Sequence, residues 1–433
     1  MKIQELFGNY KFINYLEFLK KSQYYSKEEI FDLQKEKLKH LIHESVRNIK
    51  FYHDYFRKHQ LSPSDITTPE ELRKLPIMTK RDYSPNFPKN FVNLNAPQHD
   101  LFPNSSSGST GAPFKFYMTK LQRGNVAARF MRYYEWTGRQ YGELLVKIWG
   151  TLHPNFKTKI FHKYFENIYV INAFNLTEDN FLTYYKKIKD KDIKLLEAYT
   201  SGAYAFAQLL KENNLSLEIP STILSGETLF EFQKKAVQNQ FNTEIYNRYG
   251  CREFGAIAQE CSEHMGLHIS QEDFIIEILD NNKEPVNDEE VGDIYVTSLE
   301  NYSMPLIRYK IDDRASFSSE MCPCGRNLKM FKIIEGRVSD VITSPSGRHL
   351  SLYFFALVFQ DLGNYVKEFQ IQQKTNSNEL LIYIIPTKKY NSSIETNIVT
   401  QVKKMDDSFD VFIILVEKIP LEPTGKKKYL KIV

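Results

Sequence analysis

The chain has 433 residues, of which 42% are hydrophobic and 25% charged, so it can form two or three domains with a large core. Its 57 basic and 53 acidic residues leave a net charge of +4, which argues against a nucleic-acid or strongly acidic partner. The absence of an apolar run of about 18 residues and of a signal-peptide core predicts neither a membrane span nor secretion. Four cysteines are too few for a disulfide framework and favour a reducing, cytoplasmic location.

The N-terminal part of the chain predicts a helical arm. Apolar residues recur at helical spacing over residues 27–60, beside a face rich in lysine and glutamate, which predicts one or two amphipathic helices. Ser26 and Glu29 have the spacing of a capping box at the start of this region. We interpret residues 75–80, Leu-Pro-Ile-Met-Thr-Lys, as structural. The arm is also a candidate surface for a homodimer.

A loop rich in glycine and hydroxyl side chains follows at residues 104–114, with the sequence Asn-Ser-Ser-Ser-Gly-Ser-Thr-Gly-Ala-Pro-Phe. Gly108 and Gly111 allow positive φ and a close approach of the backbone to a ligand. Hydroxyl donors for phosphate oxygens come from Ser106, Ser107, Ser109 and Thr110. The Gly-Lys-Ser/Thr ending of a Walker A loop is missing. The run predicts a loop that wraps an anion, and the alternative is a flexible surface linker.

Strand and helix patterns alternate through the middle of the chain. Residues 119–140 predict a helix directly behind the glycine loop. Apolar and β-branched runs predict strands at 116–118, 144–149, 168–171, 193–199 and 222–224. Helical patterns lie at 178–188, 201–212 and 228–238. This alternation is typical of layered α/β architecture with a largely parallel sheet.

The remaining elements predict a second, smaller domain. Residues 272–279 and 292–298 are rich in β-forming residues and predict a short β region. After Gly336 the pattern changes to an α+β unit. Its strands are expected near 367–373, 379–385 and 411–416, and its helix near 393–405. We place the boundary at the 336–340 turn, which gives an N-terminal domain at 1–335 and a C-terminal domain at 336–433.

Five further motifs follow the glycine loop: Ser225-Gly-Glu227, Tyr249-Gly-Cys-Arg-Glu253, Arg308-Tyr-Lys-Ile-Asp-Asp313, Gly336-Arg-Val-Ser-Asp340 and Pro423-Thr-Gly-Lys426. This ordered series resembles the adenylate-forming (ANL) ligases, specifically the branch of phenylacetate–CoA ligases and CapK-like capsule-biosynthesis proteins. The resemblance extends from about Gln34 to the C-terminus. It implies a large multilayered α/β N-terminal domain and a small mobile α+β C-terminal domain. It also implies an ATP-dependent, Mg²⁺-requiring ligase that adenylates a carboxylic acid, releases pyrophosphate and passes the acyl group to CoA.

The resemblance assigns one group of residues to the nucleotide. These residues are Ser106, Ser107, Gly108, Ser109, Thr110, Gly111, Ser225, Gly226, Glu227, Tyr249, Gly250, Asp313 and Arg337. The loop members would cover the β- and γ-phosphates, and Tyr249 would stack on the adenine. The run at 225–227 would pass along the adenine, with a tight turn after a strand as its alternative. Asp313 would accept hydrogen bonds from both ribose hydroxyls, and we choose it over Asp312 by register.

Three residues are assigned to catalysis, namely Lys426, Glu253 and Arg337. Lys426 would bring an ammonium group to the carboxylate and the α-phosphate, and its alternative is a solvated basic tail. Glu253 would bind Mg²⁺ that bridges the phosphates, and its alternative is a solvated pair with Arg252 at a helix start. Arg337 would contact ATP beside the hinge, or else belong to a plain interdomain turn. The hinge position carries Ser339 where the family commonly has Asp or Lys.

The identity of the acid substrate stays open at this point. Family placement assigns the acid pocket to Trp149, Tyr199, Gly250 and Gly255. The two aromatic residues would suit an aryl or apolar acid, although both are equally compatible with an ordinary core. The acceptor is CoA by default, and CapK-like character suggests an amine instead, in surface-polysaccharide or natural-product synthesis. A non-catalytic nucleotide-binding subunit is the third alternative, because the usual Thr-Gly-Asp is replaced here by Ile-Asp-Asp.

The cysteines and two histidines predict a metal site. Cys322-Pro-Cys-Gly is a tight pair of thiols, and Cys261 is followed by His264 and His268. Three thiolates and one imidazole make a complete tetrahedral set for structural Zn²⁺. In the CapK-like branch a Cys…Leu-His element often accompanies Cys-x-Cys-Gly-Arg. The resemblance therefore favours the set Cys261, His268, Cys322 and Cys324, with His264 as the alternative imidazole. The other alternative is free cytosolic thiols, and Cys251 is left unpaired.

Overall fold

The computed structural model describes residues 10–83, 87–93, 95–106, 114–150, 167–173, 178–337, 341–344, 349–351, 362–374, 377–420 and 428–433, and single positions at 176, 346, 355, 358 and 359. The chain divides into two compact units. The first unit contains Met1–Tyr141 and Tyr246–Ile334, and the second contains Gly142–Ile245 and Glu335–Val433. Within the described ranges, no helix is long and apolar enough to cross a membrane.

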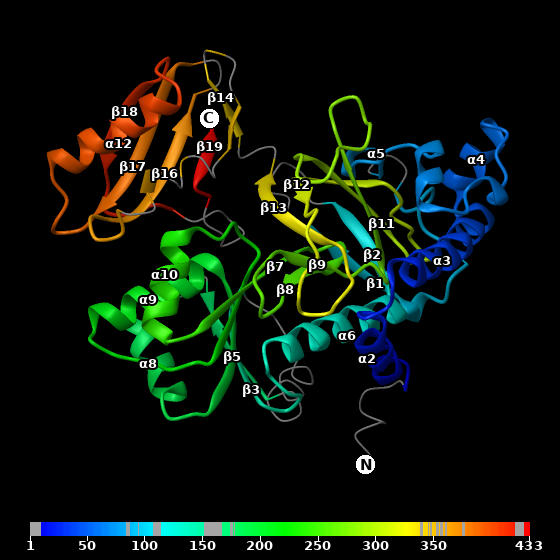
Figure 1. Ribbon diagram of the computed structural model, residues 1–433, viewed down its shortest axis with the longest axis horizontal. Coiled ribbons are helices and arrows are strands. Elements are labelled where there is room, and N and C mark those ends of the chain that lie inside the picture. Colours follow the sequence, from blue (N-terminus) through cyan, green and yellow to red (C-terminus); the bar gives the residue numbers. More distant parts are fainter. Residues whose placement is uncertain are drawn as a thin grey trace. The chain divides into compact units, whose positions relative to one another are not determined.

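A helical arm begins the first unit, drawn in blue in Figure 1. Its helices are α2 (Tyr10–Ser22), α3 (Lys27–Asn48) and α4 (Lys50–Lys58), followed by η1 (Pro63–Asp65), η2 (Pro69–Lys74), α5 (Lys80–Tyr83) and η3 (Gln98–Asp100). The capping box predicted at the start of α3 is present, because Ser26 and Glu29 each accept the other's backbone N–H. Apolar residues of α3 and α4 pack with Ile275, Leu299 and Ile307, which anchors the arm on the sheet.

The sheet of the first unit has the strand order β10-β11-β12-β13-β9-β8-β7. In chain order these are β7 (Glu244–Cys251), β8 (Gly255–Glu260), β9 (Leu267–Ile269), β10 (Phe274–Leu279), β11 (Gly292–Ser298), β12 (Tyr309–Phe317) and β13 (Met330–Arg337). The strand pairs with a printed register are antiparallel. A separate hairpin of β1 (Leu101–Ser105) and β2 (Lys115–Thr119) flanks the glycine loop. Its Phe116 and Met118 join the core of the sheet, which positions both ends of that loop.

Helix α6 (Lys120–Trp136) carries two arginines that are fully buried. Arg129 donates hydrogen bonds of 2.6 Å to both Asp273 and Glu300, and Arg132 donates one of 2.6 Å to Glu272. Tyr15 of α2 also donates to Asp273. Buried charges are tolerated when they are paired and hydrogen-bonded, so this network ties the arm, α6 and the sheet together.

The second unit begins with a parallel α/β layer. Strands β3 (Leu144–Trp149), β4 (Ile168–Asn172), β5 (Ile193–Tyr199) and β6 (Ser221–Ser225) lie in the order β6-β5-β3-β4. Their printed pairings are parallel. Helices α8 (Glu178–Ile188), α9 (Thr200–Glu212) and α10 (Glu231–Phe241) connect them and, in green, gather beside β5 in Figure 1. Apolar residues of the strands and helices form one core, as the predicted alternation requires.

The C-terminal part of the second unit forms a small α+β sheet, drawn in orange and red in Figure 1. Its strands β16 (Val366–Gln373), β17 (Glu379–Pro386), β18 (Asp410–Leu415) and β19 (Leu430–Ile432) have the order β18-β17-β16-β19. Helix α12 (Ser392–Met405) packs Ile398 and Val402 into the core of this sheet. A two-stranded ribbon, β14 (Val341–Thr343) with β15 (His349–Ser351), precedes it.

The predicted fold class is confirmed: the protein is α/β, with a large system of strands and a smaller C-terminal sheet. Strands β3 and β5 and helix α8 have the predicted bounds, and α10 begins three residues later than expected, at Glu231. Helix α2 and strands β7, β8, β9, β12, β13, β14, β15 and β19 were not predicted. The predicted boundary at 335/336 stays a prediction. The chain passes from the first unit into the second between Ile334 and Glu335, one residue before the predicted boundary.

Candidate active site

The base of the glycine loop is closed by its two ends. The backbone N–H of Ser106 donates to the carbonyl of Phe114 at 2.9 Å, and the Phe114 N–H donates to the Ser106 hydroxyl at 3.0 Å. The predicted phosphate-binding residues Ser107, Gly108, Ser109, Thr110 and Gly111 lie outside the described residues. Ser106 is therefore a loop anchor in this structure, and the anion-binding role of its neighbours stays a prediction.

The Tyr-Gly-Cys-Arg-Glu motif forms the end of β7 and the turn into β8. The alternative interpretation, which placed Arg252 and Glu253 at the start of a helix, is therefore wrong. Arg252 donates to the Asn104 side chain at 3.4 Å, which brings this turn to the base of the glycine loop. Both glycines here have packing reasons of their own. A Cβ on Gly250 would lie 2.2 Å from the Gly255 carbonyl oxygen, and Gly255 has φ of +72°. Their predicted contact with the acid is not needed to explain them.

Glu253 is nearly buried, with 8% of its surface exposed, so it is not a solvated surface residue. The hydroxyl of Tyr309 donates to its Oε1 at 3.2 Å. Burial and the nearby Glu253 carboxylate raise the pKa of Tyr309 above its ordinary value, which keeps the phenol protonated as a donor. A carboxylate oxygen has the donor chemistry that Mg²⁺ prefers, and the neighbouring Arg252 contacts the base of the glycine loop.

The two aspartates of the Arg-Tyr-Lys-Ile-Asp-Asp motif point to different partners. Asp313 accepts a hydrogen bond of 2.6 Å from the Tyr249 hydroxyl. Asp312 has φ of +72°, and its carboxylate lies 3.3 Å from the ammonium of Lys80. Two residues predicted to hold one nucleoside, Tyr249 and Asp313, are thus in direct contact. The choice of Asp313 over Asp312 and the ribose contact itself stay predictions.

The run at 75–80 has a larger part in this region than its interpretation as a structural segment suggested. Met78 forms a parallel bridge with Tyr309, and Lys80 reaches Asp312. Arg308 donates to both oxygens of Glu277 and to the Leu75 carbonyl, which locks the start of β12. Sequence reasoning missed Tyr309 and Lys80, although both lie inside motifs that it had singled out.

The second unit holds the other predicted site residues. Trp149 and Tyr199 stack on each other, with ring centroids 4.0 Å apart and planes at 24°. Ser225 ends β6 and Gly226 follows with φ of +80°, as a tight turn after a strand requires. The Glu227 carboxylate accepts hydrogen bonds from the Ser201 amide (2.7 Å) and hydroxyl (2.9 Å). Arg337 is the last residue of β13. Ser339 and Lys426 lie outside the described residues.

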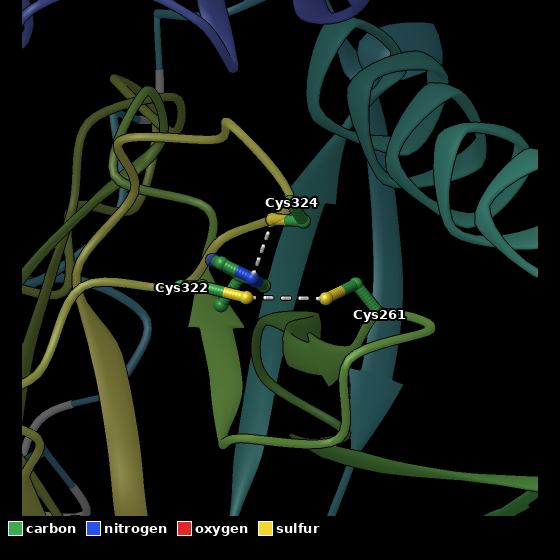
Figure 2. A group of neighbouring side chains, drawn as sticks. Cys261, Cys322 and Cys324 are labelled. Carbon is green, nitrogen blue, oxygen red and sulfur yellow. Dashed lines mark hydrogen bonds between the residues drawn. The ribbon is translucent and has the colours of Figure 1, made fainter.

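A compact cluster of thiols and one imidazole lies in the first unit. Its members are Cys261, His268, Cys322 and Cys324, whose ligand atoms all lie within 4.8 Å of one another. Figure 2 shows the three thiols converging from the loop after β8 and from the Cys-Pro-Cys-Gly turn. The Cys261 and Cys322 sulfurs are 3.6 Å apart, close to the ~3.8 Å expected of tetrahedral thiolates at Zn–S distances of ~2.3 Å. The donor set and spacing fit Zn²⁺.

The surroundings of His268 also fit a metal ligand. Its Nδ1 lies 3.3 Å from the Leu328 carbonyl, and its Nε2 faces the Cys324 sulfur at 3.4 Å. A ligand imidazole usually donates its second N–H to a carbonyl in this way. Burial lowers the pKa of His268 to about 4, which keeps the imidazole in the neutral form that binds a metal. The alternative imidazole, His264, instead lies 3.4 Å from Glu260 and is not part of the cluster.

Comparisons with known proteins agree with this geometry. Residues 342–432 match the family described as the CapK C-terminal domain. The chain is 24% identical to Protein CapK of Staphylococcus aureus, covering 93% of this chain and 89% of CapK. It is 26% identical to the phenylacetate–coenzyme A ligase of Thermus thermophilus, covering 73% of this chain and 72% of the ligase. A crystal structure of 2-hydroxyisobutyryl-CoA ligase, in complex with R3-HIB-AMP, superposes with a TM-score of 0.78 at 16% identity, covering 94% of this chain and 90% of that one.

The chain therefore has the fold of the adenylate-forming ligases. Its sequence is similar to CapK and to the phenylacetate–CoA ligases, and its C-terminal residues match the CapK C-terminal domain.

Proposed function

We propose that the protein is an ATP-dependent, AMP-forming ligase. It adenylates a carboxylic acid, releases pyrophosphate and passes the acyl group to the thiol of CoA. One observation carries the proposal: three motifs far apart in the sequence meet in the first unit. Arg252 contacts Asn104 at the loop base, Tyr249 contacts Asp313, and the Glu253 carboxylate faces the motif containing Asp313 through Tyr309.

The proposed roles rest on the charge and motif position of each residue and, for Asp313 and Glu253, also on their contacts. Asp313 receives the ribose hydroxyls, and the hydroxyl of Tyr249 fixes the orientation of its carboxylate. Glu253 supplies an oxygen ligand to Mg²⁺, which neutralises charge on the phosphates. Lys426 offsets the charge that develops as the acid attacks the α-phosphate, and Arg337 contacts ATP near the hinge at Ser339. The glycine loop covers the β- and γ-phosphates with its hydroxyls and backbone N–H groups.

The experiment is acid-dependent exchange between ATP and labelled pyrophosphate, across a panel of aryl, fatty and amino acids. Lys426→Ala should lower exchange by about 100-fold or more, because it removes a charge that acts in the transition state. Lys427→Ala, the neighbour in the same basic run, is the matched control and should stay within about twofold of wild type. Tight ATP binding with no exchange for any acid would instead support the non-catalytic nucleotide-binding subunit.

An amine acceptor is the second candidate, and the similarity to CapK over nearly the whole chain favours it. Both candidates share the first half-reaction and differ only in the nucleophile. Acyl-adenylate formed on the protein can be mixed with CoA or with amino sugars and amino acids, and the product identified by mass spectrometry. A thioester supports the first candidate, and an amide supports the second.

We also propose that Cys261, His268, Cys322 and Cys324 hold a structural Zn²⁺. The support is their convergence and the position of His268 Nδ1 beside the Leu328 carbonyl. With four protein ligands, the ion has no open position for substrate, so it stabilises the fold and takes no part in chemistry. The four cysteines form no disulfide with one another, which suits a reducing cytoplasm. A homodimer through the helical arm completes the proposal, and sedimentation analysis would test it.

A further inference from the structure

Glu253 has a hydrogen-bond partner, Tyr309, to which the sequence motifs assigned no role. Tyr309 opens β12 directly after Arg308, and only 3% of its surface is exposed. Its hydroxyl donates to Glu253 Oε1 at 3.2 Å. The bond joins positions 56 residues apart in the chain, so it reflects the tertiary fold rather than local geometry.

Tyr309 is held in place by backbone hydrogen bonds on either side of it and by contacts of its ring. The Met78 amide donates to the Arg308 carbonyl at 3.1 Å, and the Lys310 amide donates to the Met78 carbonyl at 2.8 Å. These bonds hold the backbone before and after the tyrosine. Its ring stacks on Phe114 with centroids 5.6 Å apart, and its edge meets Phe254 at 5.9 Å. These contacts fix the position of the Tyr309 hydroxyl, and the hydroxyl in turn holds one oxygen of the Glu253 carboxylate.

The same ring contact links the carboxylate to the glycine loop. Phe114 is the residue at which that loop closes, through its paired hydrogen bonds with Ser106. Tyr309 thus lies between the loop base on one side and Glu253 on the other. A side chain in this place sets the carboxylate relative to the loop that would hold the phosphates.

We propose that Tyr309 is a positioning residue for the metal–nucleotide complex, holding Glu253 Oε1 so that the carboxylate meets Mg²⁺ in one orientation. This inference rests on the proposed role of Glu253 as a Mg²⁺ ligand. The torsion that turns a glutamate carboxylate is broad, so an unanchored carboxylate samples many orientations. Anchoring one oxygen in advance lowers the cost of fixing the group when the ion binds.

The test compares Tyr309→Phe with a matched control, Tyr83→Phe. Tyr83 is also buried, its ring lies 5.9 Å from that of Tyr309, and its hydroxyl donates to the Pro305 carbonyl rather than to Glu253. Binding of Mn²⁺ to the protein–ATP complex is measured by electron paramagnetic resonance, and Mg²⁺ dependence by pyrophosphate exchange. Tyr309→Phe should raise the Mn²⁺ dissociation constant by roughly threefold to tenfold, the typical net worth of one hydrogen bond. High Mg²⁺ should restore exchange, and Tyr83→Phe should bind Mn²⁺ as wild type does.

Glu253→Gln separates the two levels of the argument. Weakened Mn²⁺ binding in Glu253→Gln with wild-type binding in Tyr309→Phe overturns the role of Tyr309 and leaves that of Glu253. Wild-type Mn²⁺ binding in Glu253→Gln overturns both. Equal weakening in Tyr309→Phe and Tyr83→Phe marks a packing effect and also overturns the proposal. Mn²⁺ binding is read without turnover, so these outcomes hold even if no acid in the panel supports exchange.

Discussion

Neighbouring residues in one motif have separate surroundings, and this decides their chemistry. Asp312 and Asp313 are adjacent, yet one faces Lys80 and the other accepts from Tyr249. The side chain of Asp312 is 39% exposed, so its ion pair with Lys80 is screened by water and contributes little to stability. Asp313 is held by an aromatic residue that the family places at the adenine. Replacing each aspartate by asparagine should therefore have unequal effects on the KM for ATP.

Asp313→Asn should raise the KM for ATP by about tenfold to 100-fold, because the ribose loses hydrogen bonds to a charged acceptor worth ~1.5–3 kcal/mol. Asp312→Asn is the control, and asparagine tolerates the positive φ at that position. It should change the KM by less than about threefold. Steady-state exchange at varied ATP measures both variants. A larger effect at Asp312 would show that the register was chosen wrongly.

At the scale of elements, the structure places thiols and imidazole by strand register. Met330 pairs with His268, and Phe331 pairs with Leu267, so β13 carries the Cys-Pro-Cys-Gly turn to the imidazole on β9. Cys261 arrives from the end of β8, which is the next strand in the sheet. Residues from three segments would bind the proposed zinc ion together, so loss of the metal should loosen the part of the sheet that contains β8, β9 and β13.

Metal analysis of the purified protein should find roughly one zinc ion per chain, the stoichiometry of a closed four-ligand site. The double variant Cys322→Ser/Cys324→Ser should lose the zinc and melt several degrees lower, because structural zinc contributes directly to folding free energy. Cys251→Ser removes a thiol outside the cluster and should retain the zinc. A wild-type protein that is folded and free of metal would contradict the site.

At the scale of the whole molecule, a network of buried charged residues joins the helical arm to α6 and to the sheet of the first unit. Arg129 donates hydrogen bonds to the carboxylates of Asp273 and Glu300. Asp273 also accepts hydrogen bonds from Tyr15 and Lys37. Burial raises the pKa of Glu300 to about 7 from an ordinary value of 4.5, while the pKa of Asp273 is lowered by Arg129 and Lys37 despite its burial. Among the described residues, Glu300 Oε2 has no hydrogen-bond partner. As the pH rises, Glu300 therefore stays protonated to a higher pH than Asp273 does.

This shift predicts how stability changes with pH. The folded state holds the Glu300 proton more tightly than the unfolded state, so its contribution is full below about pH 4.5 and is lost as the pH rises to about 7. Wild type should lose stability between pH 5 and 8 relative to Glu300→Gln, as measured by urea midpoints. Glu17→Gln, which removes a carboxylate with 57% side-chain exposure, should follow wild type. Parallel curves for wild type and Glu300→Gln would contradict the assignment.

Local patterns in the sequence were enough to predict the α/β class and most helices and strands of the second unit. Apolar periodicity reports which face of an element is buried, and strands such as β3 and β5 carry that pattern within a few residues. The motif residues were also readable, because their type and order are properties of the chain, and their roles stay predictions. The short strands β7 to β9 were missed since glycines, charges and motif residues interrupt their alternation.

Only the tertiary structure decided which of these residues meet. The convergence of His268 with the three thiols, the contact of Tyr249 with Asp313 and the hydrogen bond from Tyr309 to Glu253 join positions that are distant in sequence. Such contacts depend on strand register and on how hairpins pack, and a shift of one residue would turn each side chain to the opposite face. The sequence by itself determined the chemical groups available, and the packing of the first unit determined their partners.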